Sequence, residues 1–67
     1  MKIVLNGEDI LLPVGCSLEG LLLKYQLEPS ITIAEVNSAI VAKENYFSVF
    51  LKEGDSVELI RFMGGGE

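Results

Sequence analysis

The chain has 67 residues, 49% of them hydrophobic, and its ten acidic residues outnumber its five basic ones, so the net charge is −5. A chain of this length forms one domain with a small core and little room for an enclosed active site. Its acidity argues against nucleic acid or an anionic membrane as a partner and favours a basic surface. We therefore do not expect an independent enzyme.

Cysteine and histidine usage limits the chemistry further. Cys16 is the only cysteine, which excludes an internal disulfide, and the chain has no histidine, the usual metal ligand and general base. We expect Cys16 to be a small half-buried residue without reactivity. The N-terminus turns polar too early for a signal peptide, and no apolar run approaches the roughly 20 residues of a membrane helix. The expectation is a soluble cytoplasmic protein with no metal, bound cofactor or membrane contact.

The chain opens with a predicted β-hairpin. Residues 2–6 have the pattern of a strand, and Asn6-Gly7 predicts a tight turn because both residue types tolerate a positive φ. Residues 9–14 would form the returning strand. Pro13 has no amide hydrogen to donate to a sheet, so the strand should end near it.

An amphipathic helix is predicted next, over residues 18–26. Ser17 is a suitable N-cap, and Pro29 prevents the helix from continuing far. Apolar side chains recur at helical spacing and should pack on a sheet: Leu18, Leu21, Leu22 and Tyr25.

The second half of the chain predicts three more strands. Their ranges are 31–36, 39–41 and 56–62, and turns are expected at Asn37-Ser38 and at 52–55. Residues 43–47 are ambiguous, and we interpret them as a helical turn that presents Tyr46 and Phe47 to the edge of the core.

This order of elements is typical of an α+β fold of the β-grasp type, a mixed sheet of four to five strands with one main helix on one face. The domain should span residues 1–61, followed by a flexible glycine-rich tail at 62–67. The strand period of two directs one apolar set towards the helix: Ile3, Leu5, Ile10, Leu12, Val36, Val57 and Leu59.

One helix cannot cover both faces of the sheet, so the remaining apolar residues predict a surface on which a partner docks. These residues are Val4, Leu11, Ile33 and Ile60, with Phe62 beside them. Several acidic residues are expected to form a solvated face, parts of which could meet a basic partner: Glu8, Asp9, Glu53 and Asp55.

The tail Phe62-Met63-Gly64-Gly65-Gly66-Glu67 contains three consecutive glycines, which cannot pack or extend a sheet. A thread without side chains could enter a channel barely wider than a peptide. We predict that Gly64 to Gly66 are disordered in the free protein, with backbone order parameters below about 0.6 by NMR relaxation. Values as high as those of the strands would contradict a free thread.

Several segments together resemble the ThiS family of thiamin-biosynthesis sulfur carriers. They are the Asn6-Gly7 hairpin, Glu35-Val36-Asn37 before the Ile40-Val41 strand, Gly54-Asp55-x-Val57-Glu58, and the closing Phe62-x-Gly64-Gly65-Gly66. Gly-Asp before the last strand is common to many ubiquitin-like domains. The combination with a glycine terminus, over nearly the whole chain, is more specific.

The resemblance implies a protein co-substrate and not a catalyst. An adenylating enzyme of the ubiquitin-activating type (ThiF-like) would use ATP to convert the C-terminal glycine carboxylate into an acyl-adenylate. Sulfur from a persulfide enzyme would then form a thiocarboxylate, which thiazole synthase (ThiG-like) uses to build the thiazole ring of thiamin. Gly66 is the implied sulfur-bearing residue, with Gly65 as the fallback, and partner active sites would recognise Phe62, Met63, Gly64 and Gly65. We expect a monomer when the protein is free.

The chain departs from the family pattern at Glu67, because family members end on glycine. Glu67 is either an added residue or an extension that a peptidase removes, or else the protein is not a working carrier. Two alternatives remain open. One is a sulfur carrier like the small subunit of molybdopterin synthase, and the other is a ubiquitin-like interaction or modifier domain.

Overall fold

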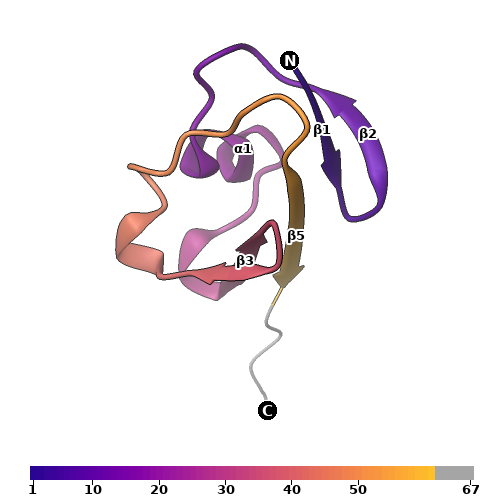
Figure 1. Ribbon diagram of the computed structural model, residues 1–67. Coiled ribbons are helices and arrows are strands. Elements are labelled where there is room, and N and C mark those ends of the chain that lie inside the picture. Colours follow the sequence, from indigo (N-terminus) through magenta and orange to yellow (C-terminus); the bar gives the residue numbers. More distant parts are fainter. Residues whose placement is uncertain (62–67) are drawn as a thin grey trace.

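The computed structural model describes residues 1–61 and confirms the β-grasp fold, with one main helix on a five-stranded mixed sheet. The strand order is β2-β1-β5-β3-β4, in which β1 and β5 are parallel and all other neighbours antiparallel (Figure 1). The last strand is therefore the middle strand of the sheet. The strands are β1 (Lys2–Leu5), β2 (Glu8–Leu11), β3 (Thr32–Val36), β4 (Ala39–Val41) and β5 (Ser56–Arg61), and the helical elements are α1 (Leu18–Lys24) and the 3-10 turns η1 (Pro29–Ile31) and η2 (Lys43–Asn45).

Both hairpins turn through two residues with positive φ, which matches the twist of the strands they join. Asn6 and Gly7 have φ of 49° and 84°, and Asn37 and Ser38 have 52° and 73°. These turns set the register, so that Leu5 pairs with Glu8 and Val36 with Ala39. The two turns predicted from the sequence are thus confirmed.

Helix α1 begins where predicted but ends two residues early, at Lys24. The Ser17 hydroxyl accepts a hydrogen bond from the Gly20 amide at 3.0 Å, as an N-cap does. At the other end Gln26 has a φ of 58°, and the Leu27 amide donates to the Leu22 carbonyl at 2.8 Å. This bond closes the helix and reverses the chain.

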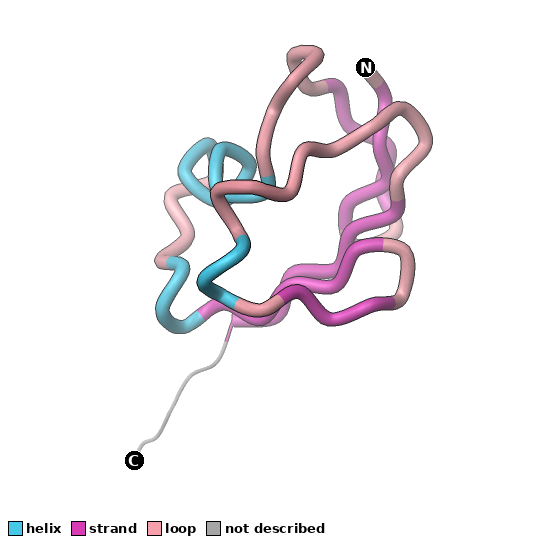
Figure 2. Tube along the Cα trace, turned by 60° about the vertical axis from the view of Figure 1, so that its left-hand side comes forward, coloured by secondary structure: helices cyan, strands magenta, loops and turns pink. Residues whose placement is uncertain are grey.

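The core lies between α1 and one face of the sheet, which Figure 2 shows with the helical segments on one side of the strands. All of the predicted inward set is buried or packs against the core, and the helix contributes its leucines. Tyr25, predicted to join them, is 43% exposed, and Leu27 packs against the core instead. The buried apolar residues are Ile3, Leu12, Leu18, Leu21, Leu22, Ala34, Tyr46, Leu51 and Val57.

Residues 43–47 were predicted to place two aromatic rings at the core edge, and the structure places one. Tyr46 is buried, and its hydroxyl donates to the Thr32 carbonyl at 2.7 Å, which satisfies the polar end of the ring. Phe47 is 64% exposed, so that part of the prediction is wrong. The turn η2 ends just before Tyr46 and can direct only one of two consecutive side chains inwards.

The limits of the first three strands differ by one to three residues from those predicted, and β1 ends at Leu5 instead of Asn6. The strand β2 ends at Leu11, two residues before Pro13, although the Leu12 amide still donates to the Met1 carbonyl at 2.8 Å. The strand β3 starts at Thr32 because η1 precedes it. The strand β5 is described as far as Arg61, and the predicted last strand residue, Phe62, lies outside the described residues. Within residues 1–61, no helix has the length and apolar character needed to span a bilayer.

Candidate functional site: the root of the tail and the open sheet face

The tail leaves from Arg61, at the end of a strand held on both sides. Arg61 pairs with Thr32 of β3. On the other side β1 ends at Leu5, and the Asn6 side chain continues its hydrogen bonding, with Asn6 Oδ1 accepting from the Leu59 amide at 2.8 Å. Since β5 lies in the middle of the sheet, the root of the tail has a fixed position relative to the rest of the domain.

The start of β5 is fixed by a buried carboxylate, Asp55. Its two oxygens accept from Asn37 Nδ2 at 3.0 Å and from the Lys52 amide at 2.8 Å, while Asn37 Oδ1 accepts from the Ser56 amide at 2.9 Å. Asp55 is only 6% exposed, so its predicted place in a solvated acidic face is wrong. Glu8, Asp9 and the other predicted members are exposed as expected. Asp55 has a structural role because it ties the turn between β3 and β4 to β5.

These contacts predict that acid weakens the fold through Asp55. Burial alone would raise its pKa, but the hydrogen bonds from Asn37 and Lys52 and the Lys52 charge outweigh it, so the pKa lies below its ordinary value of 3.8. The ionised form therefore stabilises the fold above pH 3.8, and this contribution is lost as the pH falls through the folded-state pKa. Asp55→Ala should lower the free energy of unfolding by about 1–3 kcal/mol at pH 7, and by less near pH 3.

Urea unfolding at both pH values measures this difference. Glu44→Ala, at an exposed carboxylate, is the control and should change stability little at either pH. A cost of Asp55→Ala that is equal at pH 7 and pH 3 would show that its charge is not what stabilises the fold.

The four residues predicted to form a docking face all lie on the sheet face away from α1, which we call the open face. Val4 and Ile33 are half-buried, whereas Leu11 is 75% and Ile60 49% exposed. The strand register adds Ile40, which pairs with Glu35 and is 73% exposed. Docking of a partner at this face stays a prediction.

The register divides this apolar set into two groups. Val4 pairs with Ser56, and Leu11 lies at the same end of the sheet, whereas Ile33 pairs directly with Ile60 at the end where the tail begins. Along β5, Val4 lies four residues from the level of Ile60, about 13 Å at the rise of a strand, and Leu11 lies two residues farther away. The group Ile33 and Ile60 is therefore the one next to the tail.

Acidic residues lie between the two groups. Glu35 and Glu58 are directly opposite each other on β3 and β5. Like charges in that position repel, which is a local cost to the sheet. A cation on a docked surface would relieve this repulsion.

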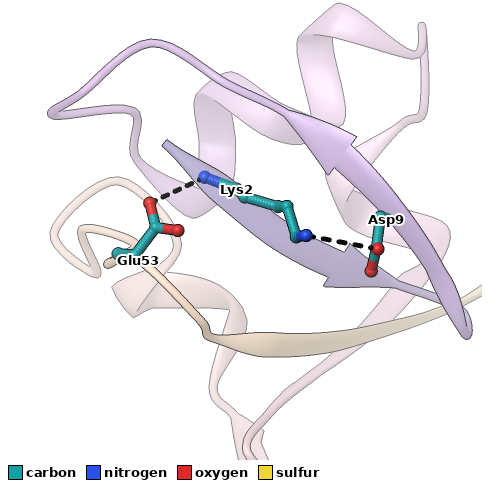
Figure 3. A network of polar contacts seen from close by, with 3 residues as sticks. All are labelled: Lys2, Asp9 and Glu53. Atoms are coloured by element: carbon teal, nitrogen blue, oxygen red, sulfur yellow. Dashed lines mark hydrogen bonds and ion pairs between the residues drawn. The ribbon is translucent and has the colours of Figure 1, made fainter.

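The far corner of the open face carries a polar network, shown in Figure 3. Lys2 Nζ lies 3.6 Å from Asp9 Oδ2, and the Lys2 amide donates to Glu53 Oε1 at 2.8 Å. Both side chains of the ion pair are more than half exposed, so the pair contributes about 0–1 kcal/mol to stability. The ion pair lies beside Leu11, so this corner of the open face carries a positive and a negative charge next to an apolar side chain.

The predicted reactive and recognition residues of the tail lie outside the described residues: Phe62, Met63, Gly64, Gly65 and Gly66. Cys16 is half-buried, and its Sγ lies 3.4 Å from the Ser17 carbonyl oxygen. Among residues 1–61 no group of three acidic or cysteine side chains is placed to hold a metal ion.

Sequence reasoning missed two residues of this site. Ile40 was assigned to a short strand but not to the open face, although its alternation with Ala39 and Val41 could have placed it there. Asn6 was interpreted only as a turn residue. Its bond to Leu59 depends on the parallel pairing of β1 with β5, which local sequence does not reveal.

Comparison with known proteins agrees with this geometry. The model of the ThiS family matches residues 2–66. The sulfur carrier protein ThiS of Bacillus subtilis is 41% identical over 63 residues, which are 92% of this chain and 96% of that protein. A thiazole synthase of Magnetococcus marinus is 42% identical over all 67 residues, but this chain spans only 21% of that protein.

A solved structure gives the same result for the fold. The crystal structure of the thiamine biosynthesis protein ThiS from Geobacter metallireducens superposes with a TM-score of 0.85 and 26% identity, covering 98% of this chain and all of the other. The family match reaches through the glycines that follow the fixed end of β5. The chain therefore belongs to the ThiS family.

Proposed function

We propose that this protein is the sulfur carrier of thiamin biosynthesis, and that its sulfur is carried as a thiocarboxylate on Gly66. The observation that carries this proposal is the match to the Bacillus subtilis sulfur carrier over nearly the full length of both chains. The matches favour a carrier of thiamin biosynthesis over the molybdopterin-synthase alternative, because the family model and the similar structure both carry ThiS names.

The chemistry that we propose requires other proteins. The Gly66 carboxylate would attack the α-phosphorus of ATP on an adenylating enzyme and release pyrophosphate. A persulfide sulfur would then attack the acyl carbon and release AMP, and reduction of the resulting S–S bond by a thiol would leave the thiocarboxylate. In this scheme the chain itself supplies the carboxylate, the reach of the tail and a surface for recognition, and its partners supply the catalysis.

Thiazole synthase is the partner for which the comparisons offer support. In Magnetococcus marinus and in Paramagnetospirillum magneticum, a segment similar to this chain forms about a fifth of a protein named thiazole synthase. A carrier domain joined to the enzyme that consumes its sulfur would be kept close to it. The adenylating enzyme and the persulfide enzyme follow from the chemistry that we propose.

The open face is the surface that we propose for recognition by the adenylating enzyme. It offers two apolar groups flanking the Glu35–Glu58 pair, so the complementary surface would carry apolar side chains around a cation. The net charge of −5 would speed the encounter with a basic surface at low salt.

Intact-mass spectrometry tests the proposed function. With the adenylating enzyme, ATP and a sulfur source, a chain ending at Gly66 should gain the mass difference between sulfur and oxygen, about 16 Da. The gain should be absent without ATP, and it should be reversed when thiazole synthase and its other substrates are added. A chain that is modified but never loses its sulfur to thiazole synthase would contradict the thiamin assignment.

A further inference from the structure

A hollow of about 390 Å³ opens on the helix side of the sheet, at the end where the tail begins. Its floor is aliphatic, and its rim includes an aromatic ring and a guanidinium group. The lining residues that matter here are Leu5, Ile10, Leu27 and Leu59 in the floor, and Tyr25 and Arg61 at the rim.

The hollow exists because α1 is too short to cover this end of the sheet. A helix of seven residues is about 10 Å long, and the chain reverses at Gln26 instead of continuing over the strand ends. Leu27 returns to the core, while Tyr25 remains 43% exposed beside the opening. The floor is therefore apolar surface that no element of the described domain covers.

The position of the hollow relates it to the tail. Arg61 lies at its rim and is also the last residue before the tail. β1 and β5 run in the same direction (Figure 1), but β1 ends at Leu5, opposite Val57, and the hollow lies between this end and the last residues of β5. Gly66 is five residues beyond Arg61, so it can lie at most about 17 Å away. An enzyme that acts on Gly66 must therefore place its surface against this end of the domain.

We propose that the hollow receives one apolar anchor side chain, aromatic or large aliphatic, from thiazole synthase, beside the channel that takes the tail. This inference rests on the proposed function. An apolar pocket with a polar rim is the setting in which a single buried side chain dominates binding between proteins. The rim includes Asn6 and Glu8, which can bond to polar groups around the anchor.

Thiazole synthase is the occupant that the observations favour. Two proteins named thiazole synthase contain a segment similar to this chain within their own polypeptide. A carrier domain that delivers its tail to an enzyme needs a contact that orients the tail. The hollow lies next to Arg61, so a side chain bound there would set the direction in which the tail leaves the domain. The open face, on the other side of the sheet, stays available to the adenylating enzyme.

The test compares two matched substitutions in the full chain. Tyr25→Asp places a charge at the rim of the hollow. Leu23→Asp places the same charge two residues earlier in the chain, at a side chain that is 63% exposed and does not line the hollow. Both put a carboxylate at the C-terminal end of α1, so the helix dipole penalises them alike. Binding to the cognate thiazole synthase is measured by titration calorimetry, and folding by thermal unfolding. We expect Tyr25→Asp to weaken binding about tenfold or more, and Leu23→Asp less than about twofold.

A second pair fills the hollow from the β2 side. Glu8→Trp should weaken binding to thiazole synthase because the indole occupies the space of the anchor, whereas Glu44→Trp, at an exposed residue of η2, should not. In the wild-type complex, methyl NMR signals of Leu27 and Leu59 should shift more than that of Leu23. Equal binding of thiazole synthase by all four variants, or unshifted methyl signals of Leu27 and Leu59, would contradict the proposal that the hollow receives an anchor side chain.

The same samples separate this inference from the proposed function. Each variant is also incubated with the adenylating enzyme, ATP and a sulfur source, and its mass is measured. If all variants gain sulfur and bind thiazole synthase like wild type, only the anchor is wrong. If the wild-type protein gains no sulfur and does not bind thiazole synthase, both the proposed function and the proposed anchor site are wrong.

Discussion

A polypeptide ending at Gly66 should gain about 16 Da when incubated with its adenylating enzyme, ATP and a sulfur source, whereas the same polypeptide ending at Glu67 should gain none. The group that is activated must be a terminal carboxylate next to a residue small enough for a narrow channel. With Glu67 present, the carbonyl of Gly66 is part of a peptide bond, and the terminal carboxylate carries an acidic side chain. That extra charge would be repelled by the phosphates of ATP in the same site.

A peptidase that removes Glu67 should restore the reaction, and adding one to the assay is the control. Tandem mass spectrometry of the C-terminal peptide locates the sulfur. If the longer form gains the mass as readily as the shorter one and keeps its glutamate, Gly66 is not the sulfur-bearing residue. If neither form is ever modified, the chain is not a sulfur carrier, and the interaction-domain alternative takes its place.

Replacing Ile60 by Asp should weaken binding to the adenylating enzyme by about tenfold or more, with little loss of stability. Ile60 is 49% exposed and lies opposite Ile33 at the end of the sheet where the tail begins. The new carboxylate would remove apolar contact from the docked surface and add charge near Glu58. Leu11→Asp should also weaken binding, by less, because Leu11 pairs with Lys2 and so lies about 20 Å farther from the tail along the strands than Ile60 does.

Val14→Asp is the matched control, since Val14 is 87% exposed and lies in the loop before α1, away from the open face. Binding is measured by titration calorimetry and stability by urea unfolding. If Ile60→Asp and Leu11→Asp bind normally but unfold easily, these residues stabilise the domain and the open face is not the docking surface.

Local sequence determined the elements of this protein and the faces of its strands. Positive-φ residue types such as Asn6-Gly7 specify two-residue turns, and the alternation of apolar residues decides which side chains of a strand point the same way. Ser17 marked the start of α1 because an N-cap depends on neighbours in the chain. The glycines after β5, together with these elements, were sufficient to identify the family.

Only the tertiary structure decided how distant residues combine. Asp55 reads as a surface acid in a turn, and its burial depends on Asn37, eighteen positions away in the sequence. The early end of α1 depends on Leu27 finding the core, and it leaves the hollow beside Arg61 open. The separation of the open face into two apolar groups follows from the register of β5 against β1 and β3. Each of these features depends on contacts between segments far apart in the chain, which local propensity and periodicity do not encode.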